Sequence, residues 1–261
     1  MNFLQCFILG ILITTVYLIY PSLDVNPSIE YDPGFCLSFD DDSFQAWQHL
    51  RPLLDKYNIK VTFFVTLQPD LTPKTQQTLK ILSTDGHEIG IHGKSHLDPI
   101  EKLRHTPVIN YIKDEYFYVR YEIEKLNIPV FSAAYVEGIR NKMMDREMKK
   151  YFRNIRSVSE SQRHQPVTDL SIIDEIFFHQ SDQVLQPLCI DEIQNIQLED
   201  IISLLNRVKE EQKIIMFYAH NPVETPSENQ WEISFKILEY IFRTCHSLGL
   251  RSYLVKDLPD A

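Results

Sequence analysis

Strand-like and helix-like segments alternate from residue 35 to residue 255, and no other feature of the sequence constrains the fold as strongly. Residues 59–65 (IKVTFFV) and 213–219 (KIIMFYA) are rich in β-branched and aromatic side chains, which is typical of buried strands. Further strands are predicted at residues 35–39, 87–91, 129–134, 154–158 and 251–255, with short ones near 172–178 and 185–190, and helices at 44–57, 74–83, 108–126, 143–152, 198–211 and 230–248. This alternation predicts parallel strands joined by crossover helices, and about seven such units favour an α/β barrel over an open sheet.

The N-terminus carries a different signal. Residues 3–20 (FLQCFILGILITTVYLIY) contain no charge. The length of this run, 18 residues, is close to the minimum for a membrane-spanning helix and longer than a usual signal-peptide core. No Lys or Arg precedes this run and no A-x-A-like cleavage site follows it, so residues 1–20 are predicted to be an uncleaved signal anchor, with a cleaved signal peptide as the alternative. Three prolines in residues 21–33 indicate a tether, and residues 34–261 form the predicted domain. The domain is expected outside the cytoplasm, anchored to the membrane, or secreted if the N-terminus is cleaved.

Charge and motif content exclude several classes of protein. The net charge of −10 argues against a nucleic-acid partner. The chain has no G-x-G-x-x-G and no Walker-type pattern, so no phosphate-binding glycine loop is expected. Cys36, Cys189 and Cys245 form no C-x-x-C motif, which excludes a zinc knuckle, and at most one disulfide can join them.

Polar side chains follow four of the predicted strands at the point where each strand ends. In parallel α/β folds the carboxyl ends of the strands meet at one mouth, where the chemistry takes place. The residues at these ends are Asp40, Asp41 and Asp42, then His92 and His96, then Tyr135 and Glu137, and finally His220 and Asn221. The sequence therefore predicts one site that combines carboxylates with imidazoles.

The spacing within this set indicates a metal site. His92 and His96 are four residues apart, which lets two imidazoles share one ion, although two solvated loop histidines would have the same spacing. A divalent cation would also make the run of carboxylates tolerable by neutralising one of them. Two His and one Asp leave a ligand position open for water, which is the pattern of a catalytic zinc, and a second carboxylate beside it would serve as general base. Asp42 directly precedes a predicted helix and is expected to cap it.

Three stretches together, SFDDD at 38–42, EIGIHGKSH at 88–96 and FYAHNP at 217–222, resemble the polysaccharide deacetylase family, also called the NodB homology domain or carbohydrate esterase family 4. The resemblance spans about residues 35–255 and implies a distorted (β/α)7-type barrel in a single domain. It also implies a divalent metal ion, Zn²⁺ with Co²⁺ or Ni²⁺ as alternatives. The site residues that it implies are Asp40 as catalytic base, Asp41, His92 and His96 as metal ligands, His220 as general acid, and the backbone N–H near Tyr135 as oxyanion donor.

Three motifs of the family are changed or missing. The third motif of the family carries an Arg that orients the base, and depending on the anchor this chain has Ser132 or Ala134 there; Arg140 in the following loop is a candidate replacement. Asp42 also replaces the usual Gly after the carboxylate pair. The fourth motif of the family holds an Asp and a Trp. Asp182 and Asp191 are candidates for the Asp, without support from spacing, and neither Trp47 nor Trp231 fits the expected order for the Trp.

The resulting interpretation is a metal-dependent hydrolase that removes acetyl groups from an extracytoplasmic polysaccharide, most often from N-acetylhexosamine units. Its expected partners are an acetylated polysaccharide or oligosaccharide and, through the N-terminal helix, the membrane. Two alternatives stay open: an O-acetyl esterase that uses the same residues, and a catalytically inactive, carbohydrate-binding relative. The missing Arg and fourth motif motivate the second alternative.

Overall fold

The structure, a computed structural model, describes residues 31–68, 71–164, 169–180, 184–228 and 230–258. Contacts divide the chain into two units, Met1–Tyr31 and Asp32–Ala261. The predicted signal anchor and most of the predicted tether lie outside the described residues, so both stay predictions. None of the helices in the described ranges has the length and apolar character needed to cross a bilayer.

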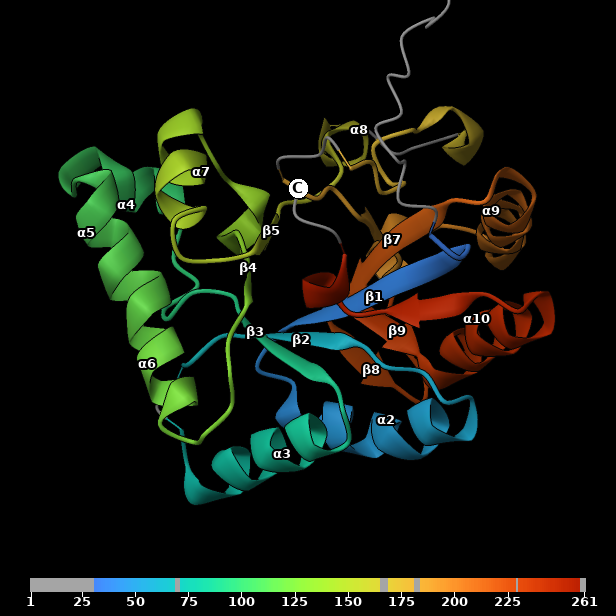
Figure 1. Cartoon of the computed structure of the whole chain (residues 1–261), viewed down its shortest axis with the longest axis horizontal. Helices are drawn as coiled ribbons and strands as arrows, with labels where there is room; N and C mark the ends of the chain where they lie inside the picture. The colour runs from blue at the N-terminus through green and yellow to red at the C-terminus, as the bar shows by residue number, and fades with distance from the viewer. Residues whose placement is uncertain (1–30, 69–70, 165–168, 181–183, 229, 259–261) are drawn as a thin grey trace, which may run out of the picture. The chain divides into compact units, whose positions relative to one another are not determined.

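A parallel sheet forms the centre of the second unit (Figure 1). Its strands are β1 (Gly34–Asp41), β2 (Thr62–Val65), β3 (Glu88–Ile91), β4 (Ser132–Ala134), β5 (Asn154–Arg156), β6 (Leu188–Cys189), β7 (Ile214–Ala219) and β10 (Arg251–Tyr253). They are ordered β5-β4-β3-β2-β1-β7-β6, and β10 pairs with the first residues of β1. Every pairing is parallel, as the alternation of strands and helices predicted.

The two edges of this sheet are linked through the segment before β6. Leu185 forms a parallel bridge with Arg156 of β5: its N–H donates to the Ile155 carbonyl (2.9 Å), and its own carbonyl accepts from the Ser157 N–H (2.8 Å). Three residues later the same segment pairs with β7 as β6. The result is an α/β half-barrel of parallel strands, consistent with the expected (β/α)7 architecture.

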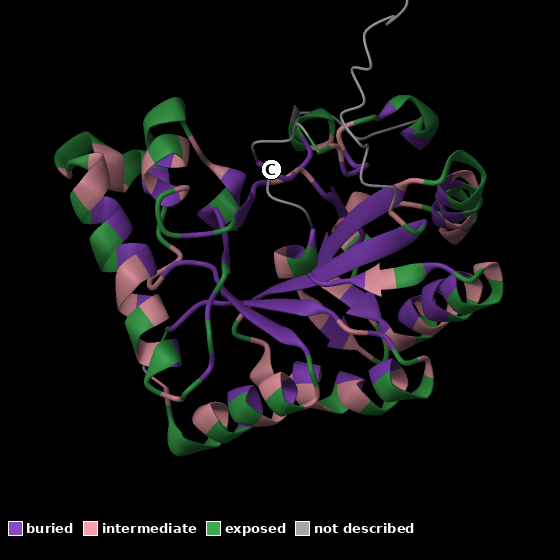
Figure 2. Ribbon diagram, viewed as in Figure 1, coloured by how far each residue is buried: buried purple, intermediate pink, exposed green. Residues whose placement is uncertain are grey.

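Helices surround the sheet, and Figure 2 shows their buried faces alternating with exposed ones, while the strands are buried almost throughout. The helices are α2 (Phe44–Lys56), α3 (Pro73–Thr84), α4 (Pro99–His105), α5 (Val108–Ile112), α6 (Tyr118–Glu124), α7 (Lys142–Met148), α8 (Glu160–His164), α9 (Leu198–Glu211) and α10 (Phe235–Leu248). A π-helical turn, Lys113–Phe117, joins α5 to α6. The core consists of the apolar residues of the strands together with the inward faces of these helices.

Three local expectations were wrong. The predicted helix at 230–248 begins at Phe235, because Glu232–Ser234 forms a short strand, β9, that pairs with β8 (Asn221–Val223). The strand predicted near 172–178 is absent from the described residues there, where only Phe177 makes an isolated bridge. Asp42 does not cap α2: the N-cap residue is Ser43, and no side chain accepts a cap hydrogen bond.

Candidate active site

The two leading carboxylates lie at the carboxyl end of β1, between β2 and β7. Successive side chains of a strand point to opposite faces, yet Asp40 and Asp41 line the same pocket. Asp41 adopts a left-handed conformation (φ 81°), which Asp tolerates better than most residues and which turns the chain at this point. Asp40 is almost fully buried, whereas Asp41 is partly exposed.

Asp41, His92 and His96 converge as the spacing predicted. The Asp41 Oδ1 atom lies 3.3 Å from His96 Nε2 and 3.7 Å from His92 Nε2, and the three potential ligand atoms all lie within 4.8 Å of one another. His92 follows β3, and its Nδ1 lies 3.2 Å from the Ala134 carbonyl. This contact orients the ring so that Nε2 faces the carboxylates, which is how metal-bound histidines are usually held.

The donor set fits a divalent metal ion. Asp41 Oδ1 is buried and accepts no hydrogen bond from any residue that the structure describes. A buried carboxylate oxygen in this state is costly unless a cation lies beside it. Two imidazole nitrogens and one carboxylate oxygen, with room for further ligands, suit zinc and the metals that resemble it.

Arg156 of β5 supplies the cation that the third motif lacks. Its Nη2 donates to Asp40 Oδ2, and its Nη1 donates to the Ser157 carbonyl (2.9 Å). The guanidinium lies 4.7 Å from the Tyr218 ring and 5.1 Å from the Phe64 ring. Burial alone would raise the pKa of Asp40, but the charges of Arg156, His92 and His220, together with the hydrogen bond from Arg156, outweigh burial and lower that pKa.

This Arg lies on a different strand from the one that the family motif predicts. The motif places it on β4, whereas the structure places it on β5, where Arg156 pairs in register with Ala134. Arg140, the sequence candidate, is paired instead with Asp145 (2.5 Å). A signal was available, because an Arg inside a predicted buried strand needs a buried acid as partner.

His220 follows β7 and is held by Asp191. The His220 Nδ1 atom lies 2.5 Å from Asp191 Oδ2, and the His220 backbone N–H donates to Asp191 Oδ1 (3.1 Å). Burial alone would lower the pKa of His220, but the hydrogen bond and charge of Asp191 outweigh it and raise that pKa. Of the two candidates for the missing Asp, Asp191 lies at the site and Asp182 lies outside the described residues.

Both tryptophans contact His220, although neither stands where the order of the fourth motif would place its Trp. The Trp231 ring lies 4.9 Å from the imidazole at an angle of 61°, and Trp47 Nε1 donates to the His220 carbonyl (3.4 Å). The reason is the pairing of β8 with β9: the register of Asn221 with Glu232 brings Trp231 beside His220. No sequence spacing reveals such a pairing.

Tyr135 lines the pocket but differs from its expected role. Its backbone N–H donates to the Arg156 carbonyl (2.8 Å), which continues the pairing of β4 with β5. Its hydroxyl donates to Asp145 Oδ1 (2.9 Å), away from the metal ligands. The N–H of Tyr135 itself is therefore engaged in the sheet, in contrast to the expected oxyanion donor.

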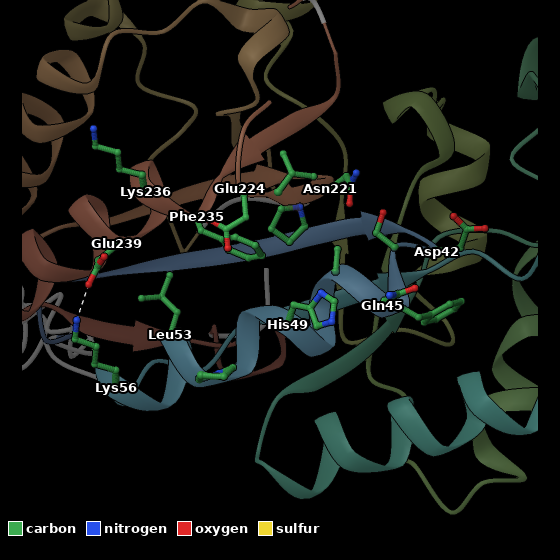
Figure 3. Close-up of a pocket in the computed structure, with 16 residues that line it drawn as sticks. Asp42, Gln45, His49, Leu53, Lys56, Asn221, Glu224, Phe235, Lys236 and Glu239 are labelled. Carbon is green, nitrogen blue, oxygen red and sulfur yellow. Dashed lines mark hydrogen bonds and ion pairs between the residues drawn. The ribbon is translucent and has the colours of Figure 1, made fainter. Parts of the chain in front are cut away.

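The pocket that these residues share has a volume of about 400 Å³ and is lined by Asp40, Asp41, His92, His96, His220 and Trp231 among others. A second, more open cavity of about 940 Å³ lies beside it, between α2, β8 and α10 (Figure 3). This cavity begins at Asp42 and Asn221, which directly follow Asp41 and His220. It extends to the ion pair of Lys56 with Glu239 (2.5 Å).

All three cysteines expected in the domain, Cys36, Cys189 and Cys245, are buried and free. Burial raises the pKa of each thiol. No disulfide joins these three cysteines in the part of the chain that the structure describes.

Comparison with known proteins gives both a sequence match and structural matches. The sequence model of the polysaccharide deacetylase family matches residues 32–155. No curated protein sequence matches the chain. Among solved structures, the catalytic domain of a peptidoglycan N-acetylglucosamine deacetylase from Eubacterium rectale is 18% identical, with a TM-score of 0.52 over 91% of this chain and 94% of that one.

Two further structures share the fold. The Xyl-CE4 domain of a multidomain xylanase from the hindgut metagenome of Trinervitermes trinervoides is 14% identical, with a TM-score of 0.51 over 88% of this chain and 95% of that one. A CE4 family pseudoenzyme from Bacillus anthracis is 12% identical, with a TM-score of 0.53 over 88% of this chain and 66% of that one. The identities are low, so these structures establish the fold alone. The match over residues 32–155 contains two of the three motif stretches, and over this part the chain is similar to the polysaccharide deacetylase family.

Proposed function

We propose that this chain is a metal-dependent hydrolase that removes acetyl groups from a polysaccharide, with N-acetylhexosamine units as its substrate. One observation carries the proposal: a single pocket holds both the carboxylate of Asp40, which is bound by Arg156, and the imidazole of His220, which is bound by Asp191. The pKa of Asp40 is lowered and the pKa of His220 is raised, although burial acts against both changes. Two groups in one pocket with pKa values driven apart in this way suit a general base and a general acid.

The residues of this chain divide the reaction between them. A divalent ion, most simply Zn²⁺, bound by Asp41, His92 and His96 would supply a Lewis acid and make water more acidic. Asp40 accepts the proton of the attacking water, and Arg156 keeps that carboxylate ionised and fixed in orientation. His220 gives its proton to the leaving group, and Asp191 holds the imidazole in the orientation that this transfer requires.

The buried pairing of His220 with Asp191 favours an amide substrate over an ester. An amine leaves only when its nitrogen is protonated, whereas an alkoxide leaves more readily, so N-deacetylation depends more strongly on a protonated acid. The inactive alternative rested on a missing Arg and a missing fourth motif. Arg156 contacts Asp40, and Asp191 and Trp231 contact His220, which supports an active enzyme.

The cavity along α2 supports a polymeric substrate. It opens directly beside the catalytic pocket and combines apolar surface from Phe44, Leu53 and Phe235 with polar groups at its rim (Figure 3). Binding clefts for organic ligands have this mixed character and size. Neighbouring sugar units would lie along it while one unit occupies the pocket.

We further propose that residues 1–20 anchor the domain outside the cytoplasm. The uncharged run at residues 3–20 supports this location. A full-length chain that is released from membranes by an alkaline wash, without detergent, would contradict it.

The test of the proposed function is acetate release by the purified full-length chain from N-acetylglucosamine oligomers, peptidoglycan and acetylxylan. Added Zn²⁺ or Co²⁺ should support the reaction, and a chelator should stop it. Asp40→Asn should reduce the rate by about 10²- to 10⁴-fold, the usual contribution of a general base. Asp200→Asn makes the same change at an exposed side chain of α9, outside both cavities, and should leave most of the rate. Equal rates in the wild type and Asp40→Asn would overturn the assignment of the base.

A further inference from the structure

Glu115 is a buried carboxylate that lies outside the pocket. It binds the loop between His92 and His96. Its Oε2 atom accepts the backbone N–H groups of Lys94 (2.9 Å) and Ser95 (2.7 Å). Its Oε1 atom accepts the Ser95 hydroxyl (2.7 Å) and the ammonium group of Lys102. Glu115 is only 3% exposed, so all four hydrogen bonds are made inside the protein.

The loop needs an external support because its backbone is unusual. His92 is fixed by the sheet: its N–H donates to the Val65 carbonyl (2.9 Å), and the Thr66 hydroxyl donates to its carbonyl (3.2 Å). Beyond it, the chain is left-handed at Gly93 (φ 81°) and again at His96 (φ 47°). A non-glycine residue in this conformation persists only where its surroundings hold it. The hydrogen bonds from Lys94 and Ser95 to Glu115 hold the stretch between these two turns.

The π-helical turn explains how Glu115 reaches the loop. Lys113–Phe117 inserts a wider turn between α5 and α6, and it buries the consecutive residues Glu115 and Tyr116. Glu115 binds the loop after β3, while the Tyr116 hydroxyl accepts the Val136 N–H (3.2 Å) from the loop after β4. Single π-helical turns inside α-helices occur frequently at functional sites. Here one turn supports two loops at the mouth of the pocket.

The charge state of Glu115 suits this task. Burial alone would raise its pKa, but the hydrogen bonds from Lys102 and Ser95 outweigh burial and lower that pKa. An ionised carboxylate accepts hydrogen bonds at both of its oxygens. The amide of a Gln at this position would instead turn its N–H₂ group toward one of the two sets of donors, which it cannot accept from.

We propose that Glu115 is a positioning residue for the metal: it holds the loop so that His96 Nε2 stays within reach of Asp41 Oδ1, 3.3 Å away. The inference rests on the metal site of the proposed function, and not on the reaction or the substrate. A ligand supplied by a loop binds an ion tightly only if the loop is already in place, because the ordering cost is otherwise taken from the binding free energy.

The test is a calorimetric titration of the metal-free, full-length chain with Zn²⁺, repeated with Glu115→Gln. Mutation of such outer partners typically weakens metal binding by about 10- to 100-fold, and that loss is expected here. With Co²⁺, the absorption spectrum of the variant should also change, because the spectrum reports the geometry of the ligands. Neither readout uses deacetylase activity, so the proposal survives or fails independently of the proposed substrate.

The matched control is Glu88→Gln. Glu88 is 2% exposed and accepts hydrogen bonds from the Thr62 hydroxyl (2.8 Å) and the Lys256 N–H (2.9 Å), but it lies at the amino end of β3, away from the ligands. It should lose stability without losing metal affinity. If Glu115→Gln is folded and binds Zn²⁺ within about twofold of the wild type, the proposal is wrong.

Ser95→Ala provides a second variant in case Glu115→Gln does not fold. It removes only the hydroxyl that donates to Glu115 Oε1, from a half-buried position. A several-fold weaker affinity for Zn²⁺ at an unchanged unfolding temperature is the expected result. An unchanged affinity in this variant, with Glu115→Gln unfolded, would reduce Glu115 to a residue of the core and overturn the proposal.

Discussion

The two sides of the pocket are built in different ways. On the metal side, His92 and His96 come from one loop, and Asp41 comes from the end of the neighbouring part of the sheet. On the proton-transfer side, the residues come from separate segments. Arg156 lies in β5, Asp191 in the turn after β6, His220 directly after β7 and Trp231 directly before β9. Local spacing therefore brings the two histidines of the first side together, whereas strand pairing brings together the residues of the second.

The family match follows the same division. It covers residues 32–155, which contain all three potential metal ligands, and it ends one residue before Arg156. The proton-transfer side lies almost entirely beyond it. If the two sides are separable in this way, mutations on the proton-transfer side should change proton chemistry and stability while metal binding persists.

The largest effect is expected for Arg156→Met. Removing one partner of a buried ion pair leaves Asp40 uncompensated, which typically costs about 3–5 kcal/mol of stability, and the rate should fall by at least about 100-fold. Chemical denaturation and acetate release measure the two losses. Arg140→Met is the control, because the Arg140–Asp145 pair is partly exposed and should cost about 1 kcal/mol or less. Similar losses in both variants would remove the distinction between the two arginines.

Asp191→Asn should have a smaller, pH-dependent effect. Without the carboxylate, burial is left to lower the pKa of His220, so the alkaline limb of the rate profile should move to lower pH. The raised pKa of His220 also means that the pair stabilises the fold below about pH 6.5 and loses this contribution as pH rises through the folded pKa. The cost of the mutation, about 1.5–3 kcal/mol at pH 6, should therefore shrink in alkaline solution.

A surface pair supplies the control for this prediction. Asp174 lies 3.1 Å from His179 and is well exposed, so Asp174→Asn should leave the alkaline limb in place. Zn²⁺ affinity should stay within a few-fold of the wild type in Asp191→Asn. A loss of metal binding as large as that expected for Glu115→Gln would mean that the two sides are not separable.

The smallest effect is expected along the second cavity. His49→Trp introduces a large ring at an exposed position of α2 that lines this cavity (Figure 3). The value of kcat/KM for a pentamer of N-acetylglucosamine should fall about fivefold, equivalent to about 1 kcal/mol, while the value for a dimer stays unchanged. Lys80→Trp on α3 introduces the same ring away from the cavity and should change neither value. Equal losses for both chain lengths would place the polymer elsewhere.

The sequence alone determined the fold class and the metal side. Parallel strands follow from the alternation of buried-strand and amphipathic-helix patterns, and the carboxyl ends of such strands meet at one mouth whatever their order. Asp40, Asp41, His92, His96 and His220 could therefore be chosen because each follows a strand. His92 and His96 are only four positions apart, so the chain itself keeps them close, whereas Asp41 lies far from them in the sequence and could be chosen only because it follows a parallel strand of the same sheet.

Only the tertiary structure decided which residues complete the other side. Arg156 reaches Asp40 because β5 and β1 belong to one curved sheet, although 116 positions separate the two residues. Trp231 reaches His220 through the pairing of β8 with β9, and the backbone N–H of Tyr135 donates a hydrogen bond to β5. Strand order and register arise from packing over the whole core, so they leave no periodic or spacing signal in the sequence. A guanidinium can neutralise the base from any strand that lines the pocket, because charge and distance decide its effect and the position of a motif does not.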